Sequence, residues 1–310
     1  METAPYRADL AEGPEDLRAI WCDTDDDVRL RLGISEAGGR GTVLIFPGRT
    51  ECLEKYGRIS ARLAAEGFAT LCVDWRGQGL SDRLSDNPIL GHVRKFTDYQ
   101  LDVQVALDAA RDHGLPEPFH LLAHSMGGAI GLRALLEGMP VHSAAFSAPM
   151  WGIPVSTRDK WLGRHLGWLF IWLGLGEVIA PGTDKTPYLL TAEFDDNLLT
   201  TDPEEFAYMV RQVVEIRELG IAGPSLNWVR EAICECHWFE SQSLPDLPVT
   251  IGYGTNERVV PIEQIRTIGQ RWQGANLIDV QDAEHELLME SPEKRAPFFE
   301  PVLQMFRETA

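Results

Sequence analysis

The chain has 310 residues, which is enough for one large domain or for a core that carries an insertion. Its 28 basic and 47 acidic residues give a net charge of -19 at pH 7, which argues against nucleic acid or an anionic membrane surface as the main electrostatic partner. The hydrophobic fraction of 44% suits a globular protein with a sizeable core.

The cysteines and the N-terminal segment indicate where the protein works. The five cysteines are odd in number and their spacing predicts no disulfide framework, which favours reduced thiols in the cytoplasm. The run Cys234-Glu235-Cys236-His237 looks like part of a metal site, but no second cysteine pair stands at ligand spacing, so we expect no metal. Residues 1–16 are not typical of a secretory signal, and the apolar run 166–176 is too short to span a bilayer.

The first part of the chain alternates predicted strands and helices. Two strands, 18–22 and 28–34, flank an Asp-rich turn and predict an edge hairpin. The elements expected next are the apolar strand 42–46, the helix 53–65, the buried strand 68–73 and the amphipathic helix 98–111. The strand 42–46 runs into Pro47-Gly48-Arg49, and the strand 68–73 ends at Asp74.

The segment 119–136 contains a candidate nucleophile. The apolar run 119–123 predicts a buried strand, and it leads through His124-Ser125-Met126-Gly127-Gly128 into a helical pattern at 129–136. A serine on a sharp strand-to-helix turn, between small residues, is typical of the nucleophile elbow of serine hydrolases. The usual first glycine of Gly-x-Ser-x-Gly is Ala123 here, and small residues also flank serines in ordinary strand–turn–helix corners, so this motif alone leaves both interpretations open.

The alternation breaks off in the middle of the chain and then returns. After a strand at 142–146, residues 150–244 show helical patterns rich in tryptophan and no regular alternation. The later elements are the strand 249–253, the helix 262–272, the strand 276–280 and the helix 292–307. Such alternation predicts an α/β fold with a mostly parallel sheet. We expect residues 1–149 and 245–310 to form the core and 150–244 to form a helical cap above the carboxyl ends of the strands.

Ester hydrolysis needs a base and an acid besides the nucleophile, and in this fold they follow it in the order acid, then His. His285 lies in the loop after the strand 276–280, from which it can reach the elbow, although a loop histidine in solvent is the alternative. Glu257 is the carboxylate of the loop after the strand 249–253, and its alternative role is a surface turn with Arg258. Asp279 and Asp282 are the other candidates for the acid.

Two main-chain amides should hold the oxyanion that forms during acyl transfer. One is the amide of Met126, the residue after the nucleophile, at the start of a helix whose dipole favours negative charge. The other is expected in the loop after the strand 42–46, where Gly48 permits an unusual turn and Arg49 supplies the amide.

These motifs resemble those of the α/β-hydrolases, and most closely those of the bacterial lysophospholipase and monoacylglycerol lipase group. Residues 74–83 resemble the Asp-x-Arg-Gly-x-Gly-x-Ser segment of the superfamily, and residues 47–51 resemble the group's His-Gly-x-x-Glu loop with Pro47 in place of the His. Residues 257–260 and 285–290 resemble the group's acid and His loops. The resemblance spans about residues 40–307 and implies the hydrolase fold, a triad of Ser125, Glu257 and His285, and no cofactor.

The cap is the place where the substrate should be selected. Residues 161–179 are apolar nearly all round, which predicts a helix packed inside the cap, a wall of an acyl tunnel, or a patch that touches micelles or membranes. An apolar cap over a serine triad suits a substrate with a long hydrocarbon arm. Arg49 and Arg258 are candidates to meet a phosphate head group, or they form structural ion pairs.

We therefore expect a serine hydrolase that cleaves a small ester substrate with an apolar acyl chain, and the resemblance favours lysophospholipids or monoacylglycerols. A short-chain carboxylesterase or thioesterase with the same triad is an alternative, and so is a hydrolase-fold protein that binds without catalysis. Dehalogenase and epoxide hydrolase chemistry needs an aspartate where Ser125 stands. The sequence does not determine the oligomeric state.

Overall fold

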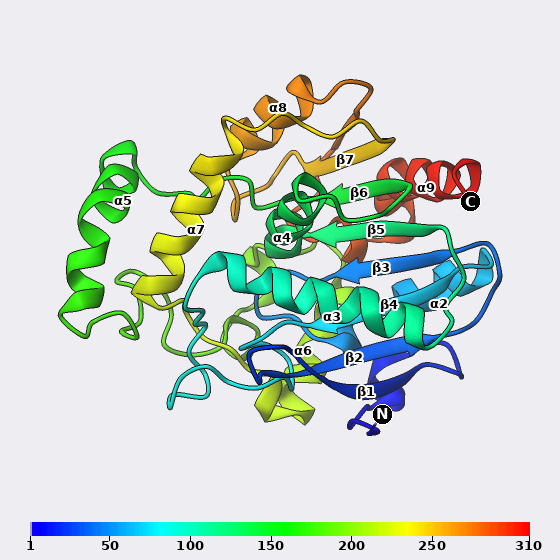
Figure 1. Ribbon diagram of the computed structural model, residues 1–310, viewed down its shortest axis with the longest axis horizontal. Coiled ribbons are helices and arrows are strands. Elements are labelled where there is room, and N and C mark those ends of the chain that lie inside the picture. The colour runs from blue at the N-terminus through cyan, green and yellow to red at the C-terminus, as the bar shows by residue number, and fades with distance from the viewer. Residues whose placement is uncertain (1) are drawn as a thin grey trace.

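The computed structural model describes residues 2–310, apart from the side chains of Thr157, Asp159, Leu166 and Phe170. An eight-stranded sheet forms its centre, in the order β1-β2-β4-β3-β5-β6-β7-β8 (Figure 1). The strands are β1 (Arg18–Asp23), β2 (Arg29–Ser35), β3 (Thr42–Phe46), β4 (Ala69–Asp74), β5 (Phe119–His124), β6 (Ser143–Ser147), β7 (Val249–Gly254) and β8 (Asn276–Val280). The pairs β1–β2 and β2–β4 are antiparallel and the other neighbouring pairs are parallel, which confirms the predicted α/β fold with its edge hairpin.

Helices cover both faces of this sheet. The helices are α1 (Ala8–Ala11), α2 (Gly57–Ala65), α3 (Tyr99–Asp112), α4 (Ser125–Leu136), α5 (Thr157–Trp172), α6 (Pro203–Glu215), α7 (Leu226–Phe239), α8 (Ile262–Arg271) and α9 (Pro292–Glu308). Figure 1 shows α3 and α4 in front of the sheet, with α2 and α9 behind it. Strand β3 serves both layers, because Leu44 and Phe46 pack in the core under α3 and α4 while Val43 and Ile45 pack in the core under α2 and α9. This explains why the central strands β3 to β7 are buried at every position.

Two helices begin differently from the expectation. The predicted helix 53–65 starts as a 3₁₀ turn (Leu53–Tyr56) and continues as α2 from Gly57. A Cβ at Gly57 would lie 1.9 Å from the carbonyl oxygen of Ala11, so glycine lets α1 approach at this junction. The predicted helix 129–136 begins four residues earlier, at Ser125. The sequence pattern did not indicate this first turn, because its small residues carry no apolar periodicity.

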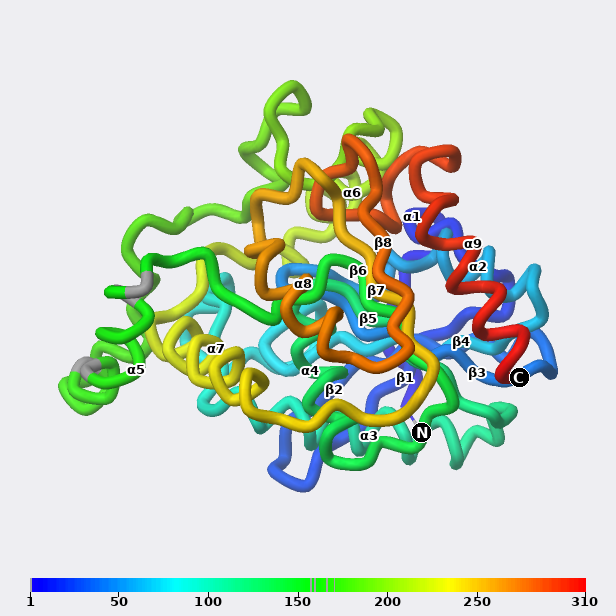
Figure 2. The backbone as a smooth tube through the Cα atoms, turned by 90° about the horizontal axis from the view of Figure 1, so that it is seen from above, coloured from blue at the N-terminus to red at the C-terminus, as the bar shows by residue number. Residues whose placement is uncertain are grey.

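The segment between β6 and β7 holds α5, α6 and α7. Both views show α5 at the outer end of the molecule, with α7 between it and the sheet (Figures 1 and 2). Helix α6 instead packs against the core: the hydroxyl oxygen of Tyr208 lies 2.7 Å from the carbonyl oxygen of Ala11 and 2.6 Å from that of Glu54. None of the helices described here is both long and apolar enough to cross a membrane.

Candidate active site

Ser125 stands on a strained turn between β5 and α4. His124 ends β5 in an extended conformation, and Ser125 has a φ of 49°, which non-glycine residues rarely adopt. A Cβ at Gly127 would lie 2.1 Å from the carbonyl oxygen of Phe46, so the helix can pass the end of β3 only with glycine there. Strain of this kind, held in place by tight packing, is typical of functional residues.

Three of the predicted residues form one hydrogen-bonded chain. Nε2 of His285 lies 2.9 Å from Oγ of Ser125, and Nδ1 of His285 lies 2.6 Å from Oε2 of Glu257. A carboxylate only accepts hydrogen bonds, so Nδ1 carries the hydrogen and Nε2 is left to accept the serine proton. The segments that follow β5, β7 and β8 each supply one of these residues at the carboxyl edge of the sheet.

The surroundings of Glu257 keep it ionised. Its second oxygen, Oε1, accepts the main-chain amides of Val259 at 2.6 Å and Val260 at 3.0 Å. Burial opposes the charged form, but the adjacent His285 and these two amides outweigh it and hold the pKa of Glu257 below its ordinary value. Glu257 can therefore orient the imidazole and balance its charge when it is protonated.

The same pairing acts on His285 in the opposite direction. Burial disfavours the imidazolium, but the carboxylate of Glu257, followed by those of Glu286 and Glu51, raises the pKa of His285 above its ordinary value. The ring is thus a stronger base than a free histidine.

The two alternative acids lie elsewhere. Asp279 is exposed on β8, and Asp282 is exposed in the following turn, where its amide donates to Oγ1 of Thr255. Within the described part of the chain, the carboxylate that accepts from His285 is that of Glu257.

Neighbouring groups fix the loop that follows β3. The indole of Trp75 donates to the carbonyl oxygen of Pro47 at 2.9 Å, and the amide of Thr50 donates to the side chain of Gln78 at 2.7 Å. Among the residues described, none accepts a hydrogen bond from the amide of Arg49. Met126 lies in the first turn of α4, where amides have no partner inside the helix.

The motif 74–83 supports this loop and does not reach the triad. Asp74 is buried and its carboxylate accepts from the amides of Leu53 at 2.9 Å and Leu80 at 2.8 Å and from Nε of Arg31 at 2.7 Å. Gly79 has a φ of 50°, and a Cβ there would lie 2.0 Å from the Asp74 carboxylate. The motif therefore fixes a loop near the site.

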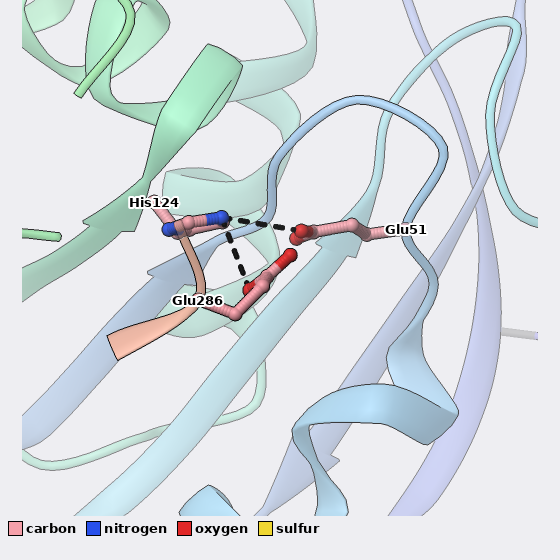
Figure 3. Close-up of side chains that lie close together, drawn as sticks. All are labelled: Glu51, His124 and Glu286. Carbon is pink, nitrogen blue, oxygen red and sulfur yellow. Dashed lines mark ion pairs between the residues drawn. The ribbon is translucent and has the colours of Figure 1, made fainter. Parts of the chain in front are cut away.

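The sequence interpretation overlooked a cluster of buried charges next to His285. Glu51, His124 and Glu286 point toward one another from the loop after β3, the end of β5 and the loop after β8 (Figure 3). The ring centroid of His124 lies 4.7 Å from that of His285. The signal available was the resemblance of residues 47–51 and 285–290 to family motifs that contain Glu51 and Glu286.

This trio has ligand atoms within 4.8 Å of one another, close enough to share a metal ion. However, the ammonium of Lys55 lies 2.6 Å from a carboxylate oxygen of Glu51 and 2.6 Å from one of Glu286. Lys55 therefore already supplies the cation that the two carboxylates need.

The two arginines that were candidates for a head group differ in their partners. Arg258 forms ion pairs with Asp196 at 3.0 Å and Glu284 at 3.3 Å, beside a polar cavity of about 720 Å³ that also borders Glu257. The side chain of Arg49 donates to the carbonyl oxygen of Ala222 at 2.8 Å and lies over the ring of Trp228, and none of the described carboxylates pairs with it. Burial lowers the pKa of Arg49 to about 10, so it remains a cation at neutral pH.

Comparisons with known proteins agree with this geometry. The family model described as "Serine aminopeptidase, S33" matches residues 38–292. Lysophospholipase L2 of Escherichia coli K12 is 30% identical over 273 residues, which cover 85% of this chain and 79% of that protein. Probable lysophospholipase L2 of Haemophilus influenzae is 26% identical and covers 84% of this chain and 82% of its own length.

A solved structure shares the fold along nearly the whole chain. The monoglyceride lipase of Saccharomyces cerevisiae superimposes with a TM-score of 0.73 at 17% identity, covering 99% of this chain and 98% of that one. The central sheet, the family match and the relatives lead to one conclusion: the chain belongs to the serine aminopeptidase S33 family and has the α/β-hydrolase fold.

Proposed function

We propose that the protein is a lysophospholipase-like serine hydrolase in which Ser125, His285 and Glu257 form the catalytic triad. The observation that carries the proposal is the hydrogen-bonded chain from Oγ of Ser125 through His285 to Glu257. In this mechanism His285 takes the proton of Ser125 as its Oγ attacks the ester carbonyl, and then passes it to the leaving alcohol. Water, activated by the same ring, attacks the acyl-enzyme and releases the fatty acid.

The amides of Met126 and Arg49 are proposed to hold the oxyanion. The position of Met126 in the first turn of α4 and the unoccupied amide of Arg49 within the described loop support this assignment. Each such donor typically contributes about 3 kcal/mol of transition-state stabilisation. The reaction as proposed uses the side chains and amides of this chain and no cofactor.

The substrate class is inferred from the relatives and from the inserted segment. Residues 150–244 are proposed to form a cap, and the relatives named lysophospholipase and monoglyceride lipase support a lipid ester with one long acyl chain. The test is acyl release from esters of increasing chain length, with Ser125→Ala as the blank. A rate that rises with chain length is expected, whereas activity confined to short chains would favour the carboxylesterase or thioesterase alternative. Binding without any turnover that depends on Ser125 would favour the non-catalytic alternative.

Arg49 is proposed to contact the phosphate of a lysophospholipid, because it is a cation without a described acidic partner on the loop beside the nucleophile. Arg49→Gln keeps the main-chain amide and should lower kcat/KM for lysophosphatidylcholine about 10- to 100-fold, the usual worth of a charge-assisted hydrogen bond. Monoacylglycerol of the same chain length serves as the internal control and should lose little. An equal loss on both substrates would contradict the assignment.

Helix α5 is proposed to touch the micelle or membrane that presents the substrate. Trp161, Trp168 and Trp172 recur at helical spacing on one side of it, and their exposed fractions are 55%, 56% and 75%. The helix lies at the outer end of the molecule (Figures 1 and 2), so the interpretation as a fully packed cap helix does not hold. The apolar side chains expected at 166 and 170 lie outside the described residues.

The α5 surface can be tested with a double variant. Changing Trp168 and Trp172 together to serine should lower activity on micellar lysophosphatidylcholine about tenfold or more, since each buried aromatic contributes about 1.5–3 kcal/mol. Hydrolysis of a monomeric short-chain ester should stay unchanged. Val214→Ser removes an exposed apolar side chain from α6 and is the matched control. Equal effects on the two substrates would refute the surface role.

From the cysteine content, we also propose a cytoplasmic location.

A further inference from the structure

A group of buried charged side chains, which we call the ion cluster, connects three segments beside the site. Its members are Glu51, Lys55, His124 and Glu286. Glu51 and Lys55 follow β3, His124 ends β5, and Glu286 follows β8. The same three segments carry Arg49, Ser125 and His285, each within two residues of a cluster member. All four side chains are buried. A shift in the cluster would therefore change how these loops sit against one another.

The contacts within the ion cluster close into a ring. The ammonium of Lys55 bridges the carboxylates of Glu51 and Glu286 at 2.6 Å each. On the other side, Nε2 of His124 lies 3.1 Å from Glu286 and 3.4 Å from Glu51 (Figure 3). Each carboxylate thus lies between two nitrogen groups.

Contacts on both sides of the ring hold His124 in place. Its Nδ1 lies 3.0 Å from the carbonyl oxygen of Ser147, and its Nε2 faces the carboxylates of Glu286 and Glu51. The ring therefore connects the end of β5 to the other two segments of the cluster.

Glu51 links the ion cluster to the oxyanion loop. One of its carboxylate oxygens pairs with Lys55, while the other accepts the amide of Gly48 and, at 2.6 Å, the hydroxyl of Tyr56. Gly48 directly precedes Arg49, whose amide is the proposed oxyanion donor. The carboxylate of Glu51 therefore fixes the turn that sets the direction of the Arg49 amide.

The ion cluster also surrounds the His285 ring with charge. The groups that face this ring are Glu257 from the loop after β7, Ser125 from α4, and Glu286, Glu51 and His124 of the cluster, with the His124 ring centroid 4.7 Å away. After Glu257, the carboxylates of Glu286 and Glu51 are the next contributors that raise the pKa of His285.

We propose that the ion cluster is a positioning unit, which fixes the oxyanion loop against the His285 loop and places negative charge beside the His285 ring. The inference rests on the proposed function, because it assigns the cluster a role in the same hydrolysis. Its members act through Arg49 and His285 and do not touch the substrate.

Glu286→Gln and Glu51→Gln test the charge with no change in side-chain size. A histidine must be neutral to act as the base, so activity is lost as pH falls through the pKa of His285. Because this pKa is raised, the acid limb of the wild type should lie at higher pH than an ordinary histidine would give. Either variant removes a negative charge, lowers the pKa of His285 and should move the acid limb of kcat/KM down by at least about 0.5 pH unit. Glu235→Gln removes a buried carboxylate that pairs with Arg133 on α4, away from the site, and should leave the acid limb in place.

Glu51→Asp separates position from charge. The shorter side chain keeps the negative charge but withdraws from the Gly48 amide, so kcat should fall about tenfold or more while the acid limb stays at the wild-type pH. A structural role alone would lower the amount of folded enzyme, which melting temperature and titration with a fluorophosphonate measure, and would leave kcat per labelled site unchanged.

The outcomes distinguish this inference from the proposed function. Absence of ester turnover in the wild type would contradict the proposed function itself. If the wild type is active, but Glu286→Gln and Glu51→Gln both keep its acid limb and kcat, the positioning role of the ion cluster is refuted and the proposed function stands. Treatment with EDTA should not change activity, and a loss restored by a divalent cation would show that the trio holds a metal in place of Lys55.

Discussion

Ser125→Ala is expected to lower kcat for ester hydrolysis by at least about 10⁴-fold, as loss of a catalytic nucleophile does in serine hydrolases. The variant removes Oγ of Ser125, which lies 2.9 Å from Nε2 of His285. This hydroxyl is the group that the ring deprotonates in the proposed reaction. KM should change little, because the hydroxyl is small and the substrate is held by other groups. The measurement is fatty acid release from lysophosphatidylcholine at saturating substrate.

The matched variants for Ser125→Ala are His285→Ala and Ser143→Ala. His285→Ala should cost about as much as loss of the nucleophile, because residues that act as a unit are not additive. Ser143 is a buried serine on β6 that hydrogen-bonds His120 at 2.9 Å, away from the triad, and its change should leave kcat near the wild-type value. Near-wild-type turnover by Ser125→Ala or His285→Ala would refute the triad.

Glu257→Gln is expected to lower kcat by about 10²- to 10⁴-fold, less than the loss of Ser125. The amide oxygen can still accept from Val259 and Val260, so the loop should keep its form. The amide nitrogen, however, would point its hydrogens at Nδ1 of His285 and favour the tautomer that cannot accept the serine proton. Loss of the negative charge also leaves the protonated ring without its balancing group.

The test of the Glu257 prediction includes the two aspartates that are the other candidates for the acid in the sequence. Asp279→Asn and Asp282→Asn should keep kcat within about twofold of the wild type, since exposed polar changes have small effects. All three variants are compared at one pH on the basic side of the acid limb. If either aspartate change is the more damaging one, Glu257 is not the acid.

Much of the fold could be predicted because its signals are local. The central strands are short apolar runs that end at turn residues, and the alternation with helices implies the parallel sheet. The contact of Ser125, Glu257 and His285 could also be predicted, because carboxyl ends of parallel strands meet at one edge. The close approach of the Ala11 carbonyl oxygen to Gly57, at the start of α2, was not predictable, since it joins segments that lie far apart in the chain.

The contacts within the ion cluster and the exposure of α5 could not be predicted from the sequence. Glu51, His124 and Glu286 lie far apart in the chain, and neither periodicity nor spacing indicates that their side chains meet. For α5, an all-round apolar pattern fits a buried helix as well as an exposed one. Only the position of the helix outside α7 reveals that Trp172 faces outward.

The most direct test is active-site titration with a long-chain alkyl fluorophosphonate during hydrolysis of lysophosphatidylcholine. One equivalent of reagent should abolish turnover, mass spectrometry should place the adduct on Ser125, and excess lysophosphatidylcholine should slow the labelling. Full hydrolysis by labelled enzyme, or an adduct on another residue that accounts for the lost activity, would contradict the account.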